Sequence, residues 1–167
     1  METARGETAV LANSDQLYHI RPDDSFSESG KSISYTGYGF ASNRVIIGIS
    51  SKGGLELLSH ELRHAYQFEI GELGFITPEL DKIGTQFLHD KTDEVDGYRR
   101  GSFFGGSTYG VNDLPEEYKN LPNGSINIKN NPQIIKALSL PEGQREQALQ
   151  RIANEGKVFR IGKKTYK

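Results

Sequence analysis

The chain has 167 residues, of which 35% are hydrophobic and 10% aromatic, and its formal net charge at pH 7 is −2. This length and apolar content predict a folded chain with a core of its own and exclude global disorder. The small net charge argues against nucleic acid as a partner, because nucleic-acid-binding modules usually carry a concentrated excess of positive charge. The chain contains no cysteine, so disulfides and thiolate metal sites are excluded, and a metal ion would need nitrogen and oxygen ligands.

The sequence predicts a loose N-terminal segment, residues 1–30, followed by a single domain of residues 31–167. Polar and turn-forming residues fill the first segment, including the loop sequence Arg-Pro-Asp-Asp at 21–24. Terminal segments are poorly ordered unless contacts tie them down. No run of about 20 apolar residues is present, so we expect no membrane span, and the N-terminus lacks the basic and apolar parts of a signal peptide.

Two strands and a long helix are expected next. Residues 33–38 alternate in hydrophobicity and residues 44–49 form a β-branched run, which together predict an antiparallel pair of strands. Residues 52–70 have the pattern of an amphipathic helix, with Ser50 and Ser51 before it as N-caps and glycines after it as stops. We expect the strand at 44–49 to border a substrate cleft with an exposed edge, to which an extended peptide could add.

The apolar side chains of the helix at 52–70 recur at positions i, i+3, i+7 and i+10. This spacing gives one stripe for the core and leaves another face free for polar functional groups. The stripe consists of Leu55, Leu58, Leu62 and Ala65.

Loops alternate with short elements in the rest of the chain. We expect a loop at 71–85 with a helical turn at 79–83, a second helix at 91–104 capped by Asp93, a loop at 105–122, an extended piece at 125–129, helices at 132–138 and 142–154, and a strand at 158–161. The basic residues at the C-terminus are expected to form a solvated tail; they are Lys157, Arg160, Lys163, Lys164 and Lys167. We predict an α+β fold in which a small, mainly antiparallel sheet packs on two helices.

The helix at 52–70 carries an H-E-x-x-H motif. Residues four positions apart lie on the same face of a helix, so the imidazoles of His60 and His64 can bind one zinc ion. Glu61 lies one position further round the helix and can reach a water molecule at that ion as a general base. The spacing predicts a zinc hydrolase of the peptidase type.

A catalytic zinc site uses three protein ligands and leaves a fourth position for water, so a third ligand is needed. The metzincin class of zinc peptidases would place glycine and histidine at positions 67 and 70. This chain has Gln67 and Ile70 there, so the metzincin class is excluded. Glu94 is the preferred third ligand, because Gly97, one turn later, allows the second helix to approach the first closely. The other candidates are His89, Asp90, Asp93 and Asp96.

These residues resemble the gluzincin metallopeptidases. The similarity rests on HELRHAY at His60–Tyr66 and EVDGYR at Glu94–Arg99 and covers residues 44–104. It is closest to the small metallopeptidase toxin domains at the C-termini of RHS-type and other bacterial polymorphic toxins, where an H-E-x-x-H-A-Y helix precedes a helix with a glutamate and an aromatic residue. The resemblance implies a zincin-like fold, secretion or delivery into a recipient cell, cleavage of a protein there, and a cognate immunity protein.

In such an enzyme the zinc ion polarises both water and the scissile carbonyl, and Glu61 passes the proton to the leaving amine. Zincins also provide a donor for the developing oxyanion. We take Tyr98 as this catalytic residue; the other candidates are His89, Arg99, Arg100 and Tyr109. Asp93 or Asp96 is expected to accept a hydrogen bond from the free ring nitrogen of a histidine ligand.

Two other functions remain as alternatives. One is a cellular regulatory zinc peptidase, such as the ImmA-like enzymes that cleave phage-type repressors; a neighbouring gene for a DNA-binding protein or for an immunity protein would discriminate the two roles. The second is a non-catalytic zinc or protein-interaction module. Glu61 argues against this module, because an ion bound only for structure needs no base beside it.

Overall fold

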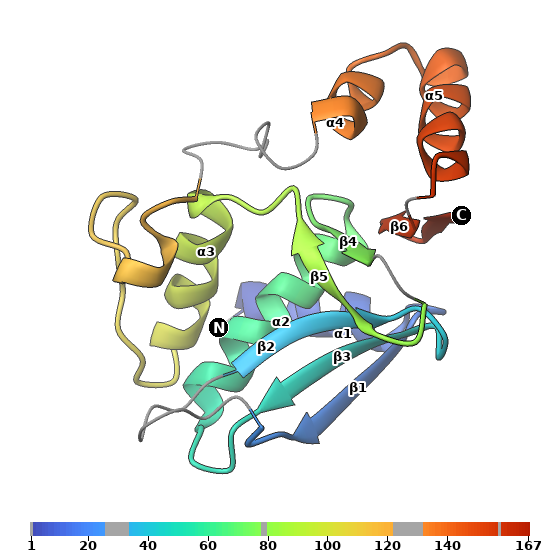
Figure 1. Cartoon of the computed structure of the whole chain (residues 1–167). Helices are drawn as coiled ribbons and strands as arrows, with labels where there is room; N and C mark the ends of the chain where they lie inside the picture. The colour runs from blue at the N-terminus through green and yellow to red at the C-terminus, as the bar shows by residue number, and fades with distance from the viewer. Residues whose placement is uncertain (1, 26–33, 78–79, 122–131, 157) are drawn as a thin grey trace.

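Seven strands form the sheet of the fold (Figure 1). The structure is a computed structural model that describes residues 2–25, 34–77, 80–121, 132–156 and 158–167. Within these residues the strand order is β1-β3-β2-β5-β4-β6-β7, and only β1 and β3 are parallel. The strands are β1 (Leu17–Pro22), β2 (Ser34–Gly39), β3 (Arg44–Ile49), β4 (Gly74–Thr77), β5 (Ile83–Phe87), β6 (Val158–Ile161) and β7 (Lys164–Tyr166). The α+β class predicted from the sequence is confirmed.

The helices divide into two groups (Figure 1). In the first group, α2 (Leu55–Glu69) packs against β2 and β3, and it contacts both α1 (Glu2–Ala12) and α3 (Lys91–Ser102). The second group is the pair α4 (Pro132–Leu138) and α5 (Glu142–Asn154), which pack on each other beside the β6 end of the sheet. A short 3₁₀ turn, η1 (Glu116–Tyr118), lies in the connection that follows α3.

The core beneath the first part of the sheet joins alternate residues of β2 and β3 to one face of α2. Tyr38 pairs with Val45 across the two strands, so both side chains point toward the helix. Val45 and Ile47 are fully buried there against Ala65 and Phe68 of α2. β-Branched residues suit this position because their side chains pack well on a pleated, half-buried surface.

α2 lies within the helix predicted at 52–70, and most of its predicted apolar stripe is correct. Ala65 belongs to the core cluster, and Leu58 and Leu62, which are partly buried, pack against it. Leu55 does not, because it is the first residue of the helix and is 63% exposed. The stripe therefore begins one turn later than the spacing predicted.

The predicted ends of α2 are partly wrong. The N-cap is Gly54, without a side-chain hydrogen bond. Ser50 and Ser51 instead bind Asp24, whose carboxylate accepts from the hydroxyl of Ser50 at 3.0 Å and from the backbone N–H of Ser51 at 2.8 Å. After the helix, Gly71 has a φ of 84°, a left-handed conformation that glycine adopts without steric cost and that ends the helix as expected.

The expectation of a loose segment over residues 1–30 is wrong for the described residues 2–25. α1 packs on α2 and buries Leu11, and β1 pairs in parallel with β3 at the edge of the sheet. The remaining residues, 1 and 26–30, lie outside the described part of the chain.

The loop expected at 71–85 contains β4 and the start of β5, which are antiparallel. Of the helical turn expected at 79–83, residues 80–82 form a turn and a bend, Ile83 begins β5, and residue 79 lies outside the described residues. Gly74 was interpreted as a helix stop, but it lies in β4, and a Cβ there would be 2.4 Å from the ring of Phe87. The missing side chain at Gly74 leaves room for the Phe87 ring to pack against β4. β4 also pairs with β6, from the far end of the chain, so part of its stability is non-local.

The expected exposed edge at residues 44–49 is wrong, because β3 lies between β1 and β2. In the described part of the chain, β2 instead has a stretch that pairs with a strand on one side only, and the Gln86 side chain donates to the Thr36 carbonyl oxygen of this stretch at 3.0 Å. β2 pairs with β5 only at Tyr38 and Gly39, and β5 then diverges from it (Figure 1). Among the described residues, no strand pairs with residues 34–37 on the side away from β3.

The C-terminal part confirms the two helices predicted at 132–138 and 142–154 and the strand at 158–161. The predicted solvated tail is only partly correct. Lys163, Lys164 and Lys167 are exposed, but residues 164–166 form β7 on the edge of the sheet, and Lys157 lies outside the described residues. Arg160 is buried rather than solvated: its guanidinium lies 4.9 Å from the centre of the Tyr38 ring. The extended piece predicted at 125–129 lies outside the described residues.

Candidate metal centre

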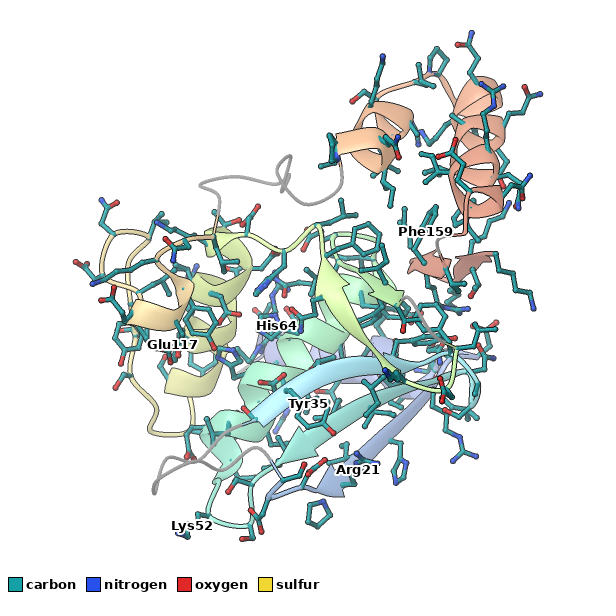
Figure 2. All side chains as sticks on the ribbon, viewed as in Figure 1. Arg21, Tyr35, Lys52, His64, Glu117 and Phe159 are labelled. Carbon is teal, nitrogen blue, oxygen red and sulfur yellow. The ribbon has the colours of Figure 1, made fainter. Side chains whose placement is uncertain are left out.

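α2 places His60 and His64 one turn apart on the face that meets α3. Their Nε2 atoms are 3.0 Å apart, and both residues are buried. Figure 2 shows His64 in the interior of the molecule, in the region between α2 and α3. The motif therefore points inward, toward a neighbouring helix, and not to the open surface.

α3 brings Glu94 to the same point. This helix begins at a capping box: Asp90 accepts hydrogen bonds from two backbone N–H groups of the first turn, and the Asp93 carboxylate accepts from the backbone N–H of Asp90. The predicted cap at Asp93 is thus replaced by Asp90. The box fixes the turn that carries Glu94, whose Oε2 lies 3.3 Å from His60 Nε2 and whose Oε1 lies 3.4 Å from His64 Nε2.

Gly97 makes this convergence possible. A Cβ at Gly97 would lie between 2.8 and 3.0 Å from three atoms of the His60 ring. The ring therefore rests directly on the backbone of α3, at a distance that no other residue type at position 97 would allow. The close approach expected from the sequence at this glycine is present.

The spacing of these groups suits a metal ion. His60, His64 and Glu94 each offer one ligand atom, and these atoms lie within 4.8 Å of one another. Two ligands at zinc-like bond lengths and a tetrahedral angle are about 3.3 Å apart, close to the observed separations of 3.0 to 3.4 Å. Glu94 Oε2 is also buried and, among the described residues, has no hydrogen-bond partner. The three residues could therefore hold a metal ion.

The charges in this group are strongly coupled. Burial alone would lower the pKa of His64, but the neighbouring Glu94 carboxylate outweighs it and raises that pKa to about 9. Burial would raise the pKa of Glu94, yet the three surrounding histidines, His64, His60 and His89, hold it far below its usual range. Without a metal ion, Glu94 is therefore ionised at neutral pH and His64 carries a proton, which a bound cation would replace.

A hydrogen-bonded chain orients the ring of His64. Its Nδ1 lies 2.8 Å from Gln67 Oε1 and donates to it, and Gln67 Nε2 donates to Asp93 Oδ1 at 2.9 Å. Nε2 of His64 is thereby directed to the other groups. We expected Asp93 or Asp96 to accept directly from a histidine; Asp93 acts through Gln67, and Asp96 instead pairs with Arg63 at 2.7 Å.

Glu61 lies between α2 and the first residues of β2. Its two carboxylate oxygens accept hydrogen bonds from the hydroxyls of Ser34, at 2.8 Å, and Thr36, at 2.7 Å. Its charge also contributes to the raised pKa of His64, three positions later on α2. β2 thus fixes the orientation of the acid in the H-E-x-x-H motif.

Tyr98 lies against the other side of His60. The two ring centres are 4.7 Å apart in an edge-to-face arrangement, and Tyr109 packs on Tyr98 at 4.6 Å. Burial, followed by the charge of Glu94, raises the pKa of Tyr98 to about 12. The phenol is therefore neutral at physiological pH and able to donate a hydrogen bond.

Tyr118, on η1, is a further phenol at this site that the sequence did not predict. Its ring centre lies 6.2 Å from that of Tyr98. Burial raises its pKa, and so do the charges of Glu94 and Glu61. No spacing could have identified it, because it belongs to an irregular connection whose path depends on the folded chain.

His89 lies beside the group on the connection from β5 to α3. Its Nε2 is 2.8 Å from Glu94 Oε1, but it is not one of the three converging residues. The preceding residue, Leu88, is buried and has a φ of 64°, a left-handed conformation that is costly for a branched side chain. Packing of Leu88 in the cluster with α4 and α5 supports that conformation and so the position of His89.

The other candidates lie elsewhere. Asp90 is used in the helix cap, Arg99 is exposed, and Arg100 pairs with Glu7 of α1. The structure thus brings together His60, His64, Glu94, Glu61 and Tyr98 from the predicted set, with His89 and Tyr109 at its border.

No protein-family model matches the chain, and neither the search for similar curated proteins nor the search for similar solved structures gave a match. None of the helices in the described residues has the length and apolar character needed to cross a membrane. The function of the chain is therefore inferred from the geometry of the site.

Replacing Gly97 with alanine tests this geometry. Alanine favours a helix over glycine by about 1 kcal/mol, so α3 itself should tolerate the change. The added methyl group must displace the His60 ring, however, and we expect metal affinity to fall at least about tenfold. Titration of the metal-free protein with Zn²⁺ against a chelating dye would measure this. The matched control is Gly143→Ala, where the methyl group meets no atom within 4 Å; equal affinities of the two variants would contradict the proposed packing.

Proposed function

We propose that the protein is a zinc-dependent endopeptidase of the gluzincin type. The observation that carries this proposal is the convergence of His60, His64 and Glu94 in a buried group, with Glu61 held next to it by β2. Two imidazoles and one carboxylate are the ligand set of catalytic zinc in several peptidases. The adjacent carboxylate adds a base, which a structural ion would not need.

Zinc is the proposed ion because the donors are two nitrogens and a carboxylate, three in number and without thiolates. A bound zinc ion would supply a Lewis acid that polarises a carbonyl group and lowers the pKa of water to about 7. His60, His64 and Glu94 would hold it. The chain from His64 through Gln67 to Asp93 would keep Nε2 of His64 directed at the ion.

Glu61 is the proposed general base. It would take a proton from the attacking water and pass it to the amine that leaves when the peptide bond breaks. The hydroxyls of Ser34 and Thr36 bind its two oxygens from the β2 side. Each carboxylate oxygen has a second lone pair, so these contacts orient the group and leave it able to accept a proton.

The phenols of Tyr98 and Tyr118 are the proposed donors to the developing oxyanion. Both lie near Glu94 and both have raised pKa values, so they are neutral donors at physiological pH. Tyr118 is the stronger candidate, because the charges of both Glu61 and Glu94 act on it. A neutral phenol beside the metal ligands would be able to donate a hydrogen bond to a reacting carbonyl.

A peptide substrate is favoured by the way in which β2 is paired. Residues 34–37 pair with β3 on one side and, among the described residues, with no strand on the other. Two of these residues, Ser34 and Thr36, contact Glu61 directly. An extended peptide that added to this edge would therefore pass next to the base.

The role as a secreted toxin or effector, with a cognate immunity protein, rests on the resemblance to polymorphic toxin domains. This role predicts an effect on the growth of cells that express the chain.

The ligand set can be tested by metal analysis. Purified protein should carry about one zinc ion, and His60→Ala, His64→Ala and Glu94→Ala should each release it, because three ligands are needed for tight binding. Glu61→Gln should retain zinc and lose turnover of a peptide library followed by mass spectrometry. Retention of zinc by Glu94→Ala, or full turnover by Glu61→Gln, would contradict the assigned roles.

The two phenols can be separated by phenylalanine substitutions. Tyr118→Phe should lower kcat about a hundredfold while zinc content and KM change little, because an oxyanion donor acts in the transition state. Tyr109→Phe serves as the control, since this ring packs on Tyr98 without contacting His60. A large loss in Tyr98→Phe and none in Tyr118→Phe would transfer the role to Tyr98.

Expression in bacterial cells tests the effector role. The wild-type chain should arrest growth, and Glu61→Gln should not, because toxicity would depend on turnover. Colony counts after induction, with equal protein amounts verified by immunoblot, would measure the difference. Normal growth with both chains would contradict the effector role and leave the peptidase assignment intact.

A further inference from the structure

Glu7 of α1 contacts both helices that carry the candidate metal ligands. Its Oε1 lies 2.8 Å from Nη1 of Arg63, on α2, and its Oε2 pairs with Nη2 of Arg100, on α3. One carboxylate therefore joins two guanidinium groups from two different helices. None of the three residues belongs to the metal centre itself.

Burial gives these contacts their strength. The exposed fractions of the side chains are 11% for Glu7, 16% for Arg63 and 6% for Arg100. Ion pairs shielded from water are screened much less than surface pairs, and removing one partner leaves a buried charge without compensation. Among the described residues, Glu7 is also the only carboxylate paired with Arg100.

A further ion pair connects α2 to α3 directly. Nη2 of Arg63 lies 2.7 Å from Asp96 Oδ2, so Arg63 binds Glu7 and Asp96 at the same time. Arg63 is adjacent to His64 in sequence, and Asp96 is two residues after Glu94. Movement of either helix at this contact therefore moves a candidate ligand.

The facing surfaces of α2 and α3 are built for close contact. Gly97 and Gly101 lie one turn apart on α3, and a Cβ at Gly101 would be 2.8 Å from the backbone oxygen of Glu56 on α2. Two glycines permit a short distance between the helices but do not enforce it, because they contribute no attractive side chain. The pairs of Glu7 with Arg63 and Arg100 supply that attraction from a third helix.

We propose that Glu7 is a positioning residue of the metal centre, which sets the distance between α2 and α3 and thereby the affinity for the metal ion. This role rests on the proposed zinc site. Zinc ligands must lie within about 0.2 Å of their ideal bond lengths, so a small separation of the helices is enough to weaken binding. α1 is then part of the support of the metal centre.

Glu7→Gln tests this role, because it keeps the size of the side chain and removes the charge. The readout is the dissociation constant for Zn²⁺, measured by competition with a chelating dye, together with the visible absorption of the Co²⁺-loaded protein, which reports ligand geometry. We expect Glu7→Gln to bind Zn²⁺ about tenfold more weakly and to alter the Co²⁺ spectrum. Glu7→Asp, whose shorter carboxylate reaches only one arginine well, should give an intermediate value and serves as the second variant if Glu7→Gln does not fold.

Two controls separate positioning from general stability. Glu2→Gln removes an exposed acid from the same helix, and Ile152→Val loosens the separate cluster around α4 and α5. Both should keep the wild-type affinity for Zn²⁺ even where the melting temperature falls. Wild-type affinity and an unchanged Co²⁺ spectrum in Glu7→Gln and Glu7→Asp would overturn the positioning role alone, whereas a wild-type chain that binds neither ion would overturn the zinc site and this role together.

Discussion

The contact between α2 and α3 is the constraint on which the site depends. His60 and His64 come from one helix and Glu94 from the other, so the group exists only while the two backbones are close. Gly97 allows this by leaving the volume of a side chain to the His60 ring. The absence of one Cβ thus matters as much as the presence of the ligands.

The parts of the fold that follow from local pattern were predicted well. α2, α3, α4 and α5 appear where the sequence pattern placed them, although the N-caps of α2 and α3 differ from the predicted ones, and β2 and β3 pair as expected. The positions of His60, Glu61 and His64 relative to one another follow from helix geometry alone. Glu94 could also be predicted as the third ligand, because Gly97 on the same helix indicates a close approach to α2.

The parts that depend on distant contacts were missed. The sequence of α1 has no apolar stripe that would predict packing, and the helix buries only Leu11. Its contact with α2 and α3 is made by Glu7, a charged residue that the sequence alone does not distinguish from an exposed acid. β4 and β5 are short and take their stability from pairing with each other and with β6. Tyr118 lies in a connection without periodicity. In each case the structure of the segment depends on contacts with residues far away in the sequence, so the sequence of the segment alone does not predict it.

The buried charges explain how such a centre can fold before it holds an ion. Glu94 would be costly to bury alone, but His64 retains a proton beside it, and the pair is close to neutral. Gln67 accepts from the opposite ring nitrogen and is itself fixed by Asp93, so the proton that a cation would displace is the one facing Glu94. A bound cation would thus replace the proton on His64, and the Glu94 carboxylate would lie beside a positive charge in both states. A group that only needed to stabilise the core would have been better served by apolar residues of similar volume, which is a physical reason to assign these three side chains a function.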